Sequence, residues 1–269
     1  MAEAQYLMAS RLRLEGRTPE AMDGAMDMLA NVVAIRSKCL AEADPDLSSA
    51  ETALATDYID GAQVSVAVKM LERVVEKSQE LSQTDDPVRL ESHFALASAY
   101  PPAKQWPQAL EILESDSKIV HGLPTAHPTR RPWQRALGFA YIHNDQVSKA
   151  IETLERLLSS MKVLPDRAME WATKYVLAEA YSEDGRPTEA IDLLKLVLEV
   201  QDGWPEDSPS RLTTQHSLAG AYYARGDTKQ GIRLLGRVVA ISQRKWPNDP
   251  SRWTTAQAQL QMMLEKNAT

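Results

Sequence analysis

The sequence predicts an all-α solenoid of about six helix-turn-helix repeats followed by a C-terminal capping helix. Three observations lead to this prediction. A short helical signature recurs five times in the 269 residues, successive copies are 40 to 42 residues apart, and a second apolar helical pattern follows most copies. A regular period of this length is typical of stacked repeats, in which each repeat buries its apolar faces against its neighbours.

The signature places a leucine four residues, and a small residue three residues, before a tyrosine. The tyrosines are Tyr58, Tyr100, Tyr141, Tyr181 and Tyr222. Because positions i, i+1 and i+4 lie on one side of a helix, these residues form a packing face. A small residue also stands nine positions after each tyrosine, which allows a second helix to approach closely. These small residues are Ala67, Ala109, Ala150, Ala190 and Gly231.

Turn and cap residues indicate where the helices end and begin. A glycine is expected in the turn of each hairpin because a helix end favours a left-handed residue. The candidates are Gly16, Gly61, Gly185 and Gly226, with Lys104 and Asp145 in their place in two repeats. Pairs such as Asp44 with Pro45 suit the N-cap and first turn of the next helix.

These signals predict one repeat domain over 1–269. The repeats are expected at 2–40, 47–82, 88–121, 129–161, 167–201 and 210–245, and the cap at 251–266. Each repeat is predicted to contain two uninterrupted helices, including one over 105–121. In the capping helix, Trp253, Leu260, Met263 and Leu264 are expected to cover the sixth repeat.

Composition limits the classes of function. The formal net charge is −7 and Lys and Arg do not cluster, so nucleic acid is not expected as a partner. No apolar run approaches the ~20 residues that a membrane-spanning helix needs. The first residues lack a signal-peptide pattern, and the single cysteine, Cys39, fits a reducing compartment. We therefore expect a cytoplasmic protein without a membrane partner.

Motifs for catalysis or cofactor binding are not found in the sequence. It contains no glycine-rich phosphate loop, no nucleophile elbow and no histidine pair at helical metal-binding spacing. His121 and His127 share a junction, but solvated histidines are the simpler interpretation. The sequence therefore predicts no catalytic residue, no cofactor and no metal, and the chain is not expected to be an enzyme.

The leucine, small residue and tyrosine of the first helix, with the alanine of the second, resemble the tetratricopeptide repeat. The period near 41 and the Asp-Pro and His-Pro junctions resemble its longer subclass, found in kinesin light chains. The stretch from Leu212 to Tyr222, with Val238 and Val239, is closer still to the arrays that end many fungal nucleotide-binding immune-type receptors. The resemblance covers nearly the whole chain and implies a right-handed solenoid with a concave groove.

The resemblance also implies which first-helix positions line that groove. The predicted partner-binding residues are Phe94, Ser98, Arg135, Phe139, Ile142, His143, Tyr175, Glu179, His216 and Tyr223. Both phenylalanines of the chain are in this set, and an aromatic cluster is what an anchoring pocket needs. The alternative is that these rings pack against the next helix.

These residues favour recognition of a protein or peptide in the groove, by the sensor array of a larger fungal receptor-like protein. Two alternatives remain open: a constitutive scaffold in a multiprotein complex, and an enzyme or small-molecule binder that uses the aromatic groove. The Asn pairs of kinesin light chains are absent, as at Thr52 and Ala53, and so is the basic set of chaperone-binding repeats. The apolar residues of the first helix, Leu7, Met8, Leu12 and Leu14, are spread around more of its circumference, which suggests self-association or contact with an upstream domain.

Overall fold

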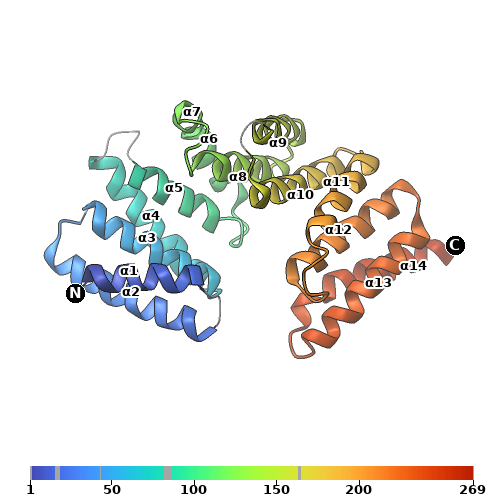
Figure 1. Ribbon diagram of the computed structural model, residues 1–269, viewed down its shortest axis with the longest axis horizontal. Coiled ribbons are helices and arrows are strands. Elements are labelled where there is room, and N and C mark those ends of the chain that lie inside the picture. The colour runs from blue at the N-terminus through green and yellow to red at the C-terminus, as the bar shows by residue number, and fades with distance from the viewer. Residues whose placement is uncertain (1, 16–18, 43, 82–86, 163–164, 269) are drawn as a thin grey trace. The chain divides into compact units, whose positions relative to one another are not determined.

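The computed structural model describes residues 2–15, 19–42, 44–81, 87–162 and 165–268 (Figure 1). These residues form α-helices joined by short connections, with one 3-10 turn at Pro250–Arg252 and no strand. First and second helices alternate in successive hairpins, and one further helix ends the array. The predicted all-α repeat fold is confirmed.

The chain divides into two compact units, 1–136 and 137–269, and each is described by itself. The helices that begin in the first unit are α1 (Ala2–Glu15), α2 (Pro19–Cys39), α3 (Pro45–Asp60), α4 (Val64–Leu81), α5 (Pro87–Ala99), α6 (Trp106–Ser115), α7 (Ser117–Gly122) and α8 (Arg130–Ile142). Those that begin in the second are α9 (Val147–Met161), α10 (Arg167–Glu183), α11 (Pro187–Val200), α12 (Pro209–Arg225), α13 (Thr228–Lys245) and α14 (Thr254–Ala268).

Close approach of the two helices in a hairpin explains the small residues of the repeat. A Cβ atom added at Gly231 of α13 would lie 2.8 Å from the carbonyl oxygen of Ala219 in α12. A Cβ at Gly138 of α8 would lie 2.6 Å from the side chain of Leu154 in α9. Real Cβ atoms do not approach other atoms this closely, so larger residues would push the helices apart.

The five turns that follow a signature tyrosine each have a left-handed residue four positions after it. These residues with positive φ are Ala62, Lys104, Asp145, Gly185 and Gly226. In each of these five turns the next backbone N–H donates to the tyrosine carbonyl, as from Gln63 to Tyr58 at 2.7 Å, which closes the end of the first helix. The expectation of a left-handed Gly61 was wrong, because Gly61 has φ −80° and Ala62 takes that conformation. Gly16 lies outside the described residues.

Two signature tyrosines also connect consecutive repeats. The Tyr100 hydroxyl of the α5 repeat donates to Glu72 in α4 at 3.2 Å. The Tyr181 hydroxyl of α10 donates to Glu155 in α9 at 2.5 Å. Burial, with the nearby carboxylate, raises the pKa of each phenol to about 12. The tyrosine therefore packs within its own hairpin and also bonds to the second helix before it.

The last helix, α14, covers one side of the α12–α13 hairpin (Figure 1). Its Ala256 and Met263 are buried with Ala219, Leu235 and Val239, and Leu260 packs against this cluster. Leu264, by contrast, is 48% exposed, so it was wrong to expect it in the covering face. The helix buries one narrow apolar stripe and leaves the remainder to solvent.

Candidate binding site

The first helices of the second unit carry a line of aromatic and polar side chains, which we call the recognition strip: Phe139, His143, Tyr175, Glu179 and Glu183. Tyr175 is its centre. The Tyr175 hydroxyl donates to Glu179 Oε1 at 2.7 Å, within α10. It also lies 3.1 Å from Ser217 Oγ of α12 and so connects two neighbouring repeats.

Glu179 is the most unusual group of the strip. Burial raises its pKa above the ordinary value because the ionised form loses solvation. The hydrogen bond from Tyr175 opposes this shift, and the charge of Glu183 adds to it. Its Oε2 atom is buried and has no hydrogen-bond partner in the part of the chain that the structure describes. An acceptor in that position gains from a donor brought by another molecule.

His143 and Phe139 form the other end of the strip. The two rings meet edge to face, with centroids 4.7 Å apart. Partial loss of solvation lowers the pKa of His143, and the carboxylate of Glu183 acts in the opposite direction. His143 itself is exposed, so the strip presents a ring, an imidazole and two carboxylates along α8 and α10.

Three other residues predicted for the groove belong to the first unit. Phe94 is half-buried and packs on Trp133 with ring centroids 5.7 Å apart, as the packing alternative expected. Ser98 is exposed. Arg135 is half-buried, its Nε has no partner among the described residues, and burial lowers the pKa of its guanidinium.

The remaining predicted residues are spread over different surroundings. Ile142 is buried, and Tyr223 packs against the buried cluster that includes Leu235. His216 lines an open cavity of about 290 Å³ between α12, α13 and the start of α14. The second unit therefore brings Phe139, His143, Tyr175 and Glu179 into one strip, whereas Ile142 and Tyr223 contribute to packing.

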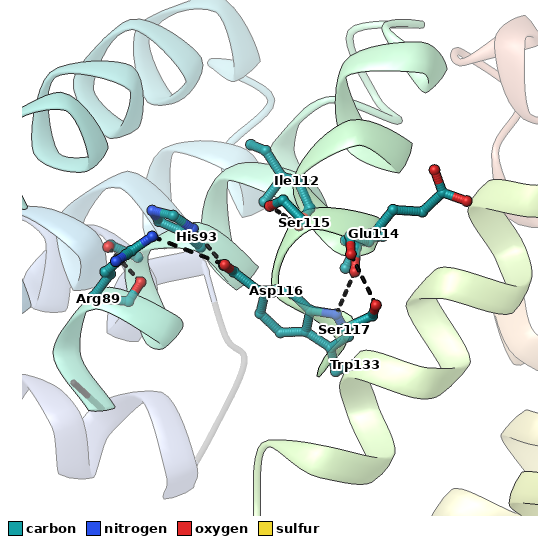
Figure 2. Close-up of polar contacts among 10 residues, drawn as sticks. Arg89, His93, Ile112, Glu114, Ser115, Asp116, Ser117 and Trp133 are labelled. Carbon is teal, nitrogen blue, oxygen red and sulfur yellow. Dashed lines mark hydrogen bonds and ion pairs between the residues drawn. The ribbon is translucent and has the colours of Figure 1, made fainter. Parts of the chain in front are cut away.

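Sequence reasoning missed a buried polar cluster in the first unit (Figure 2). His93 of α5 and Asp116, between α6 and α7, are 3% and 2% exposed. His93 Nδ1 lies 2.5 Å from Asp116 Oδ2, and Arg89 Nη2 lies 4.0 Å from Asp116 Oδ1. Figure 2 shows both side chains converging on this carboxylate from α5.

Asp116 marks the break in the helix that the sequence predicted as continuous over 105–121. The structure has two helices there, α6 and α7. The carbonyls at the end of α6 find side-chain partners instead: Ser117 Oγ donates to Glu114 at 2.8 Å, and the Trp133 indole donates to Leu113 at 3.1 Å. A signal was present, because Asp116 occupies the position of Val74, Leu157, Val197 and Val238, all of which are buried.

Two comparisons address the family of the chain. A model of the tetratricopeptide repeat matches residues 171–244. Among solved structures is a variant of the nearly identical TPR-like repeats of a Podosopora anserina protein described as a kinesin light chain. It is 32% identical, the match covers 74% of this chain and 93% of that one, and the TM-score is 0.64. The chain belongs to the tetratricopeptide-repeat family.

Other solved tetratricopeptide-repeat structures have the same fold. A second structure of the Podosopora anserina repeats is 28% identical, covers 90% of this chain and 95% of that one, and has a TM-score of 0.54. A STAND protein (signal transduction ATPase with numerous domains) with a tetratricopeptide-repeat sensor, from Pyrococcus horikoshii, is 14% identical. That match covers 93% of this chain and 42% of the other, with a TM-score of 0.56, and shows the fold alone. Comparison with curated proteins finds no match.

The tetratricopeptide repeat is a protein-interaction fold. Over the described residues, no group of three or more His, Cys, Asp and Glu side chains could hold a metal ion. No helix in those ranges is both long and apolar enough to cross a membrane.

Proposed function

We propose that this tetratricopeptide-repeat chain is a recognition module that binds a segment of a partner protein along the recognition strip. The observation that carries the proposal is the Glu179 carboxylate. One of its oxygens is bound by Tyr175 and the other is buried without a partner among the described residues. A carboxylate held this way costs stability in the free protein and gains a hydrogen bond when a partner supplies a donor.

Selection of peptides on the purified chain tests this proposal. Peptides selected from a random library are titrated against the wild type, Glu179→Gln and Tyr175→Phe. We expect each substitution to weaken binding about fivefold or more, which corresponds to the loss of about one hydrogen bond. Glu152→Gln is the matched control, because Glu152 makes an exposed ion pair with Arg156 on a second helix. Peptides that bind all four proteins equally would place recognition elsewhere.

We propose further that the module is the sensor array of a larger fungal receptor-like protein. Its support is the similarity of fold to a STAND protein that carries a tetratricopeptide-repeat sensor. The native reading frame upstream of Met1 tests this, because a nucleotide-binding domain is expected there. Stoichiometric co-purification with a constant partner, without such a domain, would favour a scaffold in a multiprotein complex.

The exposed apolar side of α1 supports a contact outside the described chain. Leu7 is 61% and Met8 is 56% exposed. We propose that a second copy of the chain or an upstream domain covers them. Sedimentation of the wild type against Leu7→Ser with Met8→Ser tests self-association, since the substitutions are expected to lower the mass of any dimer to that of a monomer.

A further inference from the structure

The cavity at the C-terminal end of the second unit differs from the recognition strip in its chemistry. Its volume is about 290 Å³, in the range of sites that hold a small ring. The floor is apolar, because Leu212 and Val238 belong to a buried cluster on which Trp246 packs. Thr255, in the first turn of α14, stands at the exposed rim.

Two polar side chains stand in the wall of this cavity, Ser242 and His216. Ser242 is 3% exposed as a residue. His216 Nε2 is buried and has no hydrogen-bond partner among the described residues. Buried polar atoms are nearly always satisfied in folded proteins, so this nitrogen points to a ligand that bonds to it.

The charges around the cavity do not favour an anion. Arg252 is the cationic side chain in the lining, but its Nε already donates to Asp249 at 2.9 Å. Its guanidinium also lies 5.0 Å from the Trp246 ring centroid. Burial lowers the pKa of His216, with partial opposition from the Gln259 side chain, so the surroundings disfavour the charged imidazole. A neutral ligand therefore fits better than a carboxylate or a phosphate.

We propose that this cavity binds a phenolic ring, with the ring against Leu212 and Trp246 and the hydroxyl at Ser242 and His216. A phenol combines an apolar face with one group that both donates and accepts, which matches the apolar floor, the unpartnered His216 nitrogen and the nearby Ser242 hydroxyl. The ring could come from a tyrosine of a partner segment or from a free small phenol, and the chemistry is the same. The site is separate from the recognition strip and does not depend on the function proposed for it.

Titration with p-cresol, followed by proton–nitrogen NMR of the whole chain, tests the proposal. We expect saturable shifts of the Trp246 indole and about fivefold weaker binding of toluene, which lacks the hydroxyl. Ser242→Ala and His216→Leu should remove that preference while leaving toluene binding nearly unchanged. Equal affinity for p-cresol and toluene in the wild type, or no saturable shift of Trp246, would overturn the proposal.

A pair of rim substitutions locates the site. Thr255→Trp should fill the cavity and abolish p-cresol binding, whereas Thr254→Trp, one residue earlier and equally exposed but outside the lining, should leave it intact. Loss of binding in both variants, or in neither, would overturn the assignment to this cavity. N-acetyl-tyrosinamide distinguishes the source: binding comparable to p-cresol supports a partner's tyrosine, and binding of p-cresol alone supports a free phenol.

Discussion

The second helices of the third and sixth repeats have residues of opposite polarity at the same buried repeat position. In α13 this position is Val238, which is 4% exposed in an apolar cluster, and the helix runs unbroken over Thr228–Lys245. In the third repeat it is Asp116, which is equally buried, and the helix divides there into α6 and α7. The difference shows that a repeat accepts a charge at a core position when its first helix supplies partners. For Asp116 these are His93 and Arg89.

Placing an aspartate at the equivalent position of the sixth repeat, without a histidine to bind it, should reduce stability more than any other change. Val238→Asp places a carboxylate in the apolar cluster of the sixth repeat, where Gln215 stands in place of His93. We expect a loss of about 3 to 5 kcal/mol in the free energy of unfolding, measured by urea denaturation. Adding Gln215→His should restore about 1 to 2 kcal/mol. No rescue by the added histidine would show that the pair alone does not make the charge acceptable.

Removing the charge from the third repeat is the converse experiment. Asp116→Val leaves His93 Nδ1 buried without its partner and should cost about 1 to 3 kcal/mol in urea denaturation. The double variant Asp116→Val with His93→Leu should recover most of that loss, because an apolar pair can replace a buried polar pair. Strictly additive losses would contradict a direct interaction between the two residues.

The turns offer a smaller comparison. Ala62 has φ +61° where Gly226 has φ +98° in the equivalent turn. Ala62→Gly should raise the free energy of unfolding by about 1 kcal/mol, and Gly226→Ala should lower it by a similar amount. Thermal unfolding measures both, and a stabilised Gly226→Ala protein would contradict the assigned turn conformation.

The pH dependence of Glu179 should give the smallest effect. Its pKa in the folded protein is raised above the ordinary value of 4.5. The folded state therefore binds more protons than the unfolded state between these two pKa values, and stability falls as the pH rises through that window. Glu179→Gln should be more stable than the wild type at pH 7, by less than the turn substitutions change stability, and nearly equal to it at pH 4. Glu152→Gln, at an exposed site on a second helix, is the matched control.

Much of the fold was predictable because the same residues recur at the same positions in successive repeats. The tyrosine and the small residue nine positions later each mark one place in a hairpin and occur in five copies, and the Asp-Pro, His-Pro and Ser-Pro pairs mark the junctions. The agreement among these copies defines the register. The error at Gly61 arose because the prediction followed the residue type and not the position in the repeat. The left-handed position lies four residues after the tyrosine, where Ala62 stands, and Gly61 lies one residue before it.

The site was less predictable because it depends on contacts between repeats. Repeat positions placed Tyr175 and Glu179 on one helix, but the hydrogen bond between Tyr175 and Ser217 of α12 could not be predicted from either segment alone. Ile142 is adjacent to His143 in sequence, yet one is buried and the other exposed. Asp116 was visible as a polar residue at an apolar position, but its partner His93 required the packing of α5 on the α6–α7 segment.

The hairpin turns, which are closed by a hydrogen bond to the tyrosine carbonyl, also affect how a gene that encodes these repeats can change in length. Because the N–H after the left-handed residue donates to the tyrosine carbonyl of the same hairpin, each of the five hairpins with a signature tyrosine completes its own turn without help from other repeats. A duplication or deletion of one whole period would leave every turn intact and would add or remove one interface between repeats. Copy number can therefore vary by unequal recombination, while the cavity beside α14 remains with the final hairpin.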